Sequence, residues 1–128
     1  YNYRMPNLNA ALGCAQLEQL PGFLSAKRQL FNSYRMAFAG LPGLHIVGEP
    51  ADCKSNFWLQ TLQLESDNPA LRDAILGATT AAGYMTRPIW APLHKMKPYA
   101  DCPCMSMTVT QSLEQCLINL PSSAGLAA

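Results

Sequence analysis

Apolar residues at helical spacing dominate the first part of the chain. Pro6 can occupy the first turn of a helix. The apolar side chains that follow it at helical spacing are Leu8, Ala11, Leu12 and Ala15. A second apolar face carries Ala10, Cys14 and Leu17. A helix with so little polar surface is normally covered on both sides, so we expect this one to meet another domain or another subunit.

The dipeptide Pro21-Gly22 predicts a break, after which a second helix begins. Its apolar side carries Phe23, Leu24, Leu30, Phe31, Tyr34 and Phe38. Its other side, which we expect to face solvent, carries Lys27, Arg28, Gln29 and Arg35. Gly40 suits a C-terminal cap, so the pattern predicts a long helical pair.

Two strands follow in the pattern. Residues 44–47 form a short apolar run between turn signals rich in proline and glycine. Residues 56–64 are rich in aromatic and aliphatic side chains, and Trp58, Leu62 and Leu64 fall in step on one face. We predict a strand over each segment.

The run Asp67-Asn68-Pro69 predicts the start of a helix, because an N-cap residue precedes a proline at the first helical position. The buried stripe of this helix would consist of Leu71, Ile75, Ala78 and Ala82, and Gly83 would end it. Residues 84–87 can then form a strand. Pro88 and Pro92 cannot donate ladder hydrogen bonds, so we expect an irregular loop there, where ligand contacts often concentrate.

The last predicted elements are a helix at residues 110–116 and a strand at 117–120, whereas residues 100–107 show no clear pattern. A helical pair followed by strands that alternate with helices predicts an α+β fold. We expect a small, mostly antiparallel sheet with helices packed on one face.

The composition excludes several classes of function. With 128 residues and 49% hydrophobic content, the chain can form one domain with a core of its own. A formal net charge of +1 supplies no field that would attract nucleic acid or an anionic membrane. No apolar run approaches the roughly 20 residues of a membrane span, and nothing resembles a signal peptide, so we expect a soluble, cytoplasmic protein.

The five cysteines lack the paired C-x-x-C spacing of a four-thiolate zinc site. Reduced thiols in a reducing compartment are the simplest account, and we expect no metal. Cys102-Pro103-Cys104 leaves a redox or metal pair open as an alternative, including zinc held by these two cysteines and His94.

Three motifs stand out along the chain, at residues 1–18 (YNYRMPNLNAALGCAQLE), 87–94 (RPIWAPLH) and 120–123 (LPSS). In sequence and in order they resemble the motifs of the DegT/DnrJ/EryC1/StrS sugar aminotransferases. The runs GCAQLEQ, CKSNFWL and MTRP are similar to the branch that aminates UDP-4-keto-6-deoxy-N-acetylhexosamines for legionaminic acid and related surface sugars. The alternative within the family is a branch similar to the perosamine synthases.

The resemblance implies the small C-terminal domain of a fold-type-I aminotransferase that uses pyridoxal phosphate. Residues 1–43 would then be a helical segment leading to a large cofactor domain outside this chain. Residues 44–123 would be the small α+β domain, and residues 124–128 a tail without regular structure. A homodimer is implied as well.

The reaction requires a lysine that holds the cofactor as a Schiff base and an acidic partner for its ring nitrogen. The four lysines are Lys27, Lys54, Lys95 and Lys97. None lies in a context similar to the family's cofactor lysine, so we expect solvated surface lysines. The resemblance places the catalytic groups upstream, which leaves no catalytic residue in this chain and predicts that the chain alone is inactive.

Recognition is what the chain can supply. By resemblance, Asn2 reaches the phosphate of the pyridoxal phosphate bound by the neighbouring subunit, as its amide N–H can donate to a phosphate oxygen. Arg4 would contact the substrate or the subunit interface, with a structural ion pair as the alternative.

A second cluster is predicted from Arg87, Trp90 and His94. An arginine can grip a diphosphate, a tryptophan can lie against a sugar or base, and a histidine can donate to a hydroxyl, which suits a nucleotide-sugar. In the alternative, a purely structural one, Trp90 belongs to the core, and Arg87 and His94 stabilise the proline-rich loop. Softer candidates are Asn56, Lys95, Tyr99 and the pair Ser122-Ser123, whereas His45 is read as structural or exposed.

The resemblance thus implies transfer of an amino group from an amino acid, expected to be glutamate, to a 4-keto-6-deoxy nucleotide-sugar. A free-standing module that binds a small molecule or a partner, without catalysis, is the alternative from a different class.

Overall fold

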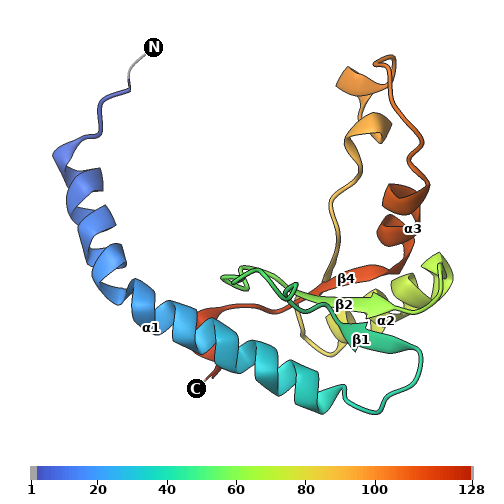
Figure 1. Cartoon of the computed structure of the whole chain (residues 1–128), viewed down its shortest axis with the longest axis horizontal. Coiled ribbons are helices and arrows are strands. Elements are labelled where there is room, and N and C mark those ends of the chain that lie inside the picture. Colours follow the sequence, from blue (N-terminus) through green and yellow to red (C-terminus); the bar gives the residue numbers. More distant parts are fainter. Residues whose placement is uncertain (1–2, 128) are drawn as a thin grey trace.

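The computed structural model describes residues 3–127, which form one long helix, a small antiparallel sheet and shorter helices (Figure 1). In chain order the elements are α1 (Asn7–Ala37), β1 (Leu44–Ile46), β2 (Gln60–Leu64), α2 (Pro69–Ala81), β3 (Arg87–Pro88), η1 (Leu93–Lys95), η2 (Lys97–Tyr99), α3 (Thr108–Cys116), β4 (Leu117–Leu120) and η3 (Ala124–Ala127). The first half of α1 and the arm that carries η1, η2 and α3 extend from opposite sides of the sheet (Figure 1).

The sheet has four strands in the order β1-β2-β4-β3, and every neighbouring pair is antiparallel. Leu62 of β2 pairs with Ile118 of β4, and Asn119 of β4 pairs with Arg87 of β3. The predicted α+β class is confirmed, and the last strand has the predicted bounds.

The core lies on one face of this sheet. Leu62, Ile118 and Leu120 are buried there, since side chains two residues apart in a strand point to the same side. Both α1 and α2 cover that face, through Tyr34, Phe38, Ile75 and Leu76. The Tyr34 hydroxyl also donates to the carbonyl of Pro121 at 2.9 Å. The prediction of helices on one face is therefore confirmed for these two helices.

The predicted break at Pro21-Gly22 is wrong, because α1 continues through both residues as a single helix. Proline lacks the N–H of one helical hydrogen bond, and its ring crowds the preceding turn. Its φ is nevertheless helical, so the chain can continue as a helix through it. Such a site commonly bends a helix, and α1 curves along its length (Figure 1). Leu30 and Phe31 in its second half are buried against the domain.

The predicted strand at residues 56–64 begins only at Gln60. Phe57 has a φ of +47°, and the side chains of Ser55 and Asn56 accept hydrogen bonds from the backbone N–H groups of Phe57 and Trp58. These local bonds form a turn in place of a ladder. Placing Trp58 in step with Leu62 was therefore wrong: Trp58 is 63% exposed, whereas Leu62 is buried.

The predicted strand at 84–87 is displaced to Arg87–Pro88, so Pro88 lies in the sheet and not in an irregular loop. Because β3 is an edge strand, a proline without an N–H is tolerated there. The segment after it is irregular until η1, as expected.

The helix predicted after Asp67-Asn68-Pro69 is confirmed as α2, and the Asn68 side chain accepts a hydrogen bond from the Leu71 N–H at 3.0 Å. Its predicted stripe is only partly right. Ile75 packs against the core, but Leu71 is exposed and Leu76 packs there instead.

The expected unstructured tail is wrong for residues 124–127, which form η3 and lie against α1. Among the helices of residues 3–127, none combines the length and apolar character that a bilayer span requires.

Candidate functional site

Trp58, Arg87 and Trp90 line one open cavity of about 440 Å³. Trp58 comes from the turn before β2, Arg87 from β3, and Trp90 from the loop that follows. Segments after β4 and around η3 close the other side, through Ser122, Ser123 and Leu126. The cavity therefore lies where three separate parts of the chain meet.

The two tryptophan rings contact each other, with centroids 5.9 Å apart and planes inclined by 42°. Trp90 is 72% exposed, which argues against the alternative that it belongs to the core. Together the rings present an aromatic surface beside the exposed Arg87 guanidinium. Such a surface suits a planar or sugar ring, and the guanidinium suits an attached anion.

Hydrogen bonds to backbone carbonyls hold the Trp58 side of the cavity. The Trp58 carbonyl accepts from Lys27 Nζ at 2.9 Å and from the Ser122 hydroxyl at 3.0 Å. Lys27 Nζ also donates to the carbonyl of Ser122. The prediction that Lys27 is a solvated surface lysine is wrong, since it is half-buried and burial lowers its pKa.

A second polar link fixes the turn just before Trp58. Arg28 Nη1 donates to Glu49 Oε1 at 2.7 Å, and Glu49 Oε2 accepts from the Ser55 backbone N–H at 2.7 Å. The hydrogen bond from Arg28 is the main reason why the pKa of Glu49 lies below its ordinary value. The guanidinium carbon of Arg28 also lies 4.9 Å from the centroid of the Phe57 ring. The Arg28 side chain, which is 37% exposed, thus contacts both the domain and solvent.

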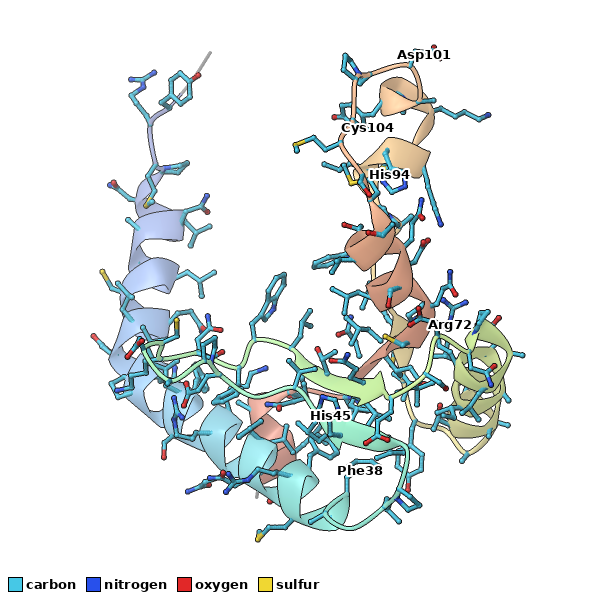
Figure 2. All side chains as sticks on the ribbon, turned by 45° about the vertical axis from the view of Figure 1, so that its right-hand side comes forward. Phe38, His45, Arg72, His94, Asp101 and Cys104 are labelled. Carbon is cyan, nitrogen blue, oxygen red and sulfur yellow. The ribbon has the colours of Figure 1, made fainter. Side chains whose placement is uncertain are left out.

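The structure does not bring His94 to the cavity of Arg87 and Trp90. His94 lies in η1, on the arm seen in Figure 2, and lines a separate pocket of about 310 Å³ with Tyr99, Cys102 and Cys104. Its Nε2 atom is buried and has no hydrogen-bond partner among the described residues. The predicted three-residue cluster is thus reduced to Arg87 and Trp90.

One of the two N-terminal candidates, Arg4, lies within the described residues. Arg4 is exposed and precedes α1, and it does not line the cavity of the two tryptophans. Asn2 lies outside the described residues.

The softer candidates have other surroundings. Lys95 forms an ion pair with Glu114, and Asn56 lines a third pocket beside Arg28 and Lys54. The Ser122 hydroxyl serves the turn at Trp58, as given above. His45 is exposed on β1, in line with its expected role.

The thiol groups form no disulfide. Cys116 is buried, which raises the pKa of its thiol, whereas Cys14, Cys53, Cys102 and Cys104 are exposed. Over residues 3–127 no group of three His, Cys, Asp or Glu side chains is arranged to hold a metal ion.

Sequence reasoning missed Trp58 and Lys27 as parts of this site. The available signal was the run CKSNFWL, which Ser55 and Asn56 mark as a turn, since both side chains readily accept local backbone hydrogen bonds. No sequence signal links Lys27 to Ser122, because they are 95 positions apart.

The chain is similar to known sugar aminotransferases over nearly its whole length. It is 31% identical to the GDP-perosamine synthase of Caulobacter vibrioides, over 98% of this chain and 34% of that protein. With the GDP-perosamine synthase of Vibrio cholerae it is 33% identical, again over 98% of this chain and 34% of that protein. The chain therefore spans about a third of the length of the curated relatives it matches.

A solved structure shows the same fold. PseC of Helicobacter pylori, an aminotransferase involved in the biosynthesis of pseudoaminic acid, superposes with a TM-score of 0.88 at 19% identity, over 98% of this chain and 34% of that chain. The profile of the DegT/DnrJ/EryC1/StrS aminotransferase family matches residues 1–128. The chain belongs to the DegT/DnrJ/EryC1/StrS aminotransferase family.

Proposed function

We propose that this chain is the small C-terminal domain of an enzyme that transfers an amino group from an amino acid, expected to be glutamate, to a 4-keto-6-deoxy nucleotide-sugar. Aminotransferases of this family use pyridoxal phosphate. The enzyme would act in the cytoplasm, as a homodimer, in the synthesis of surface polysaccharide. The relatives named as GDP-perosamine synthases support a nucleotide-sugar substrate.

The observation that carries the proposal is the cavity that combines Trp58, Trp90 and Arg87. A nucleotide-sugar has flat or ring-shaped ends joined by a diphosphate. The tryptophan rings can pack against a base or sugar, and the Arg87 guanidinium can donate two parallel hydrogen bonds to a phosphate. The small domain would thus recognise the substrate.

The described residues do not supply a cofactor lysine at this cavity. None of the four lysines is among the residues that line it. The ammonium of Lys27 is engaged by two carbonyls, and that of Lys95 by Glu114. These surroundings support the proposal that the Schiff-base lysine lies in a large domain outside this chain. On this proposal, residues 1–43 lead to that domain and residues 44–123 form the small domain. By resemblance, Asn2 would contact the cofactor phosphate of the neighbouring subunit.

The test is an amino-transfer assay on the longer polypeptide that the proposal implies, purified with pyridoxal phosphate. Glutamate is supplied with 4-keto-6-deoxy sugars carried by UDP, GDP or dTDP, and both 2-oxoglutarate and the amino-sugar product are measured. We expect equal amounts of both products with at least one sugar. Absence of transfer to all of them, with the cofactor bound, would reject the nucleotide-sugar substrate and favour the binding-module alternative.

A further inference from the structure

Three parts of the chain that are distant in sequence meet at the side chain of Lys27. The residue lies in the second half of α1, Trp58 lies in the turn before β2, and Ser122 follows β4. Lys27 Nζ donates to the carbonyls of Trp58 and Ser122, and the Ser122 hydroxyl donates to the same Trp58 carbonyl. These three hydrogen bonds link the three residues in a ring, which we name the Lys27 junction.

The backbone of Lys27 is held as well. Gln60, which is only 1% exposed, donates from Nε2 to the Lys27 carbonyl at 3.3 Å. Both ends of the lysine are therefore fixed to the domain. An ammonium with three donors is suited to joining two carbonyls, because each bond to a charged donor is stronger than a neutral one.

Two members of the Lys27 junction, Trp58 and Ser122, also line the cavity. The carbonyl that Lys27 holds belongs to Trp58 itself, and the ring of Trp58 contacts that of Trp90. The turn at Trp58 contains Phe57 with a φ of +47°, a conformation that an L-residue adopts at a cost and that surrounding contacts must hold. The hydrogen bonds from Lys27 and Ser122 to the Trp58 carbonyl, in the next residue, are such contacts.

We propose that Lys27 is a positioning residue, which sets the Trp58 ring against Trp90 and so shapes the cavity that takes the nucleotide-sugar. The assignment of the ligand rests on the proposed function above, whereas the effect of Lys27 on the two rings does not. Lys27 itself does not line the cavity.

The chain has an internal reporter of this arrangement, because its two tryptophans are the two members of the pair. Neighbouring indole rings give a paired positive and negative band in far-UV circular dichroism, whose size depends on their distance and angle. We expect Lys27→Met to lose most of this signal while the melting transition stays cooperative. Lys27→Arg can still donate to both carbonyls and should restore it. Lys97→Met removes a positive charge from η2, away from the cavity, and should leave the signal unchanged.

Quenching of the same tryptophans by UDP, GDP and dTDP then tests the ligand on the folded chain. If the wild-type chain is quenched in a saturable way, Lys27→Met should bind the same nucleotide roughly tenfold more weakly, and Lys27→Arg close to normally. Unchanged affinity in Lys27→Met would overturn the role of Lys27 and leave the proposed function intact.

If no nucleotide quenches the wild-type chain, nucleotide recognition by this domain fails, and the dichroism decides on Lys27 alone. A signal that Lys27→Met retains in full would overturn the inference. Should Lys27→Met not fold, Ser122→Ala serves in its place, since it removes one bond to the same Trp58 carbonyl and should reduce the signal in part.

Discussion

Glu49 couples the stability of the site to pH. Its pKa is lowered in the folded chain, chiefly by the hydrogen bond from Arg28, so folding favours the ionised carboxylate. Stability from this group is fully present above the ordinary pKa of about 4.5 and is lost as the pH falls through the lower, folded value.

We therefore predict that the free energy of unfolding decreases as the pH falls from about 5 to about 3, and that the decrease is smaller in Glu49→Gln. Urea unfolding across this range measures it. Glu18→Gln replaces an exposed carboxylate on α1 and is the control. If the free energy of unfolding of Glu49→Gln fell with pH as steeply as that of the wild-type chain, the hydrogen bonds of Glu49 to Arg28 and Ser55 would contribute nothing to stability.

Cys116 is predicted to be the least reactive of the five thiols. It is 2% exposed and its pKa is raised by burial, so little thiolate is available to attack a reagent. With a thiol-specific reagent and peptide mapping, we expect the four exposed cysteines to react in the folded chain and Cys116 only on unfolding. Early labelling of Cys116 would contradict the packing described for the end of α3.

At the scale of elements, α1 contains two residues that disfavour a helix. Pro21 lacks the N–H that would bond to the preceding turn, and Gly22 has open space where a Cβ would lie. We predict that Pro21→Ala raises the free energy of unfolding by about 1–2 kcal/mol and Gly22→Ala by about 0.5–1 kcal/mol. Urea unfolding of each variant measures both. Destabilisation by Pro21→Ala would mean that the curvature of α1 is needed for its packing.

The sequence predicted some elements of this fold and missed others, depending on whether local interactions decide the structure. Local signals were sufficient where hydrogen bonds are local, as at the Asn68 cap, and where a strand has one buried face, as at Leu117–Leu120. They failed at Pro21, where contacts in the second half of α1 outweigh a local preference. They also failed at Trp58, where aromatic content suggested a strand but side chains of Ser55 and Asn56 formed a turn.

The site was predicted only in part, because sequence patterns do not show which distant segments the fold brings together. Arg87 and Trp90 lie close in sequence and share a cavity, whereas His94, only four residues after Trp90, lies in another pocket because η1 redirects the chain. Helical periodicity assigned Lys27 and Arg28 to the solvent-facing side of the helix. It could not show that the loops around Trp58 and Glu49 pack against that side.

At the scale of the whole molecule, much apolar surface of α1 is uncovered. Leu8, Leu12 and Leu17 are all exposed, as the expectation of a covering domain or subunit requires. The chain also spans about a third of its curated relatives. Both observations support the proposal that a further domain, which would carry the cofactor lysine, covers this face of α1.

On that proposal, the 128-residue chain mixed with pyridoxal phosphate should form no specific aldimine. Absorbance spectra, followed by borohydride reduction and intact mass, test this. A stoichiometric adduct that disappears on substituting one of the four lysines would place the cofactor site in this chain.

The most direct test of substrate recognition is the steady-state kinetics of Arg87→Gln in the longer polypeptide that the proposal implies. Loss of a charged, paired contact to a phosphate should raise KM for the nucleotide-sugar by roughly tenfold or more, while KM for glutamate and the aldimine absorbance stay unchanged. Lys97→Met is the matched control. An unchanged KM for the nucleotide-sugar in Arg87→Gln would contradict the assignment of this cavity to the substrate.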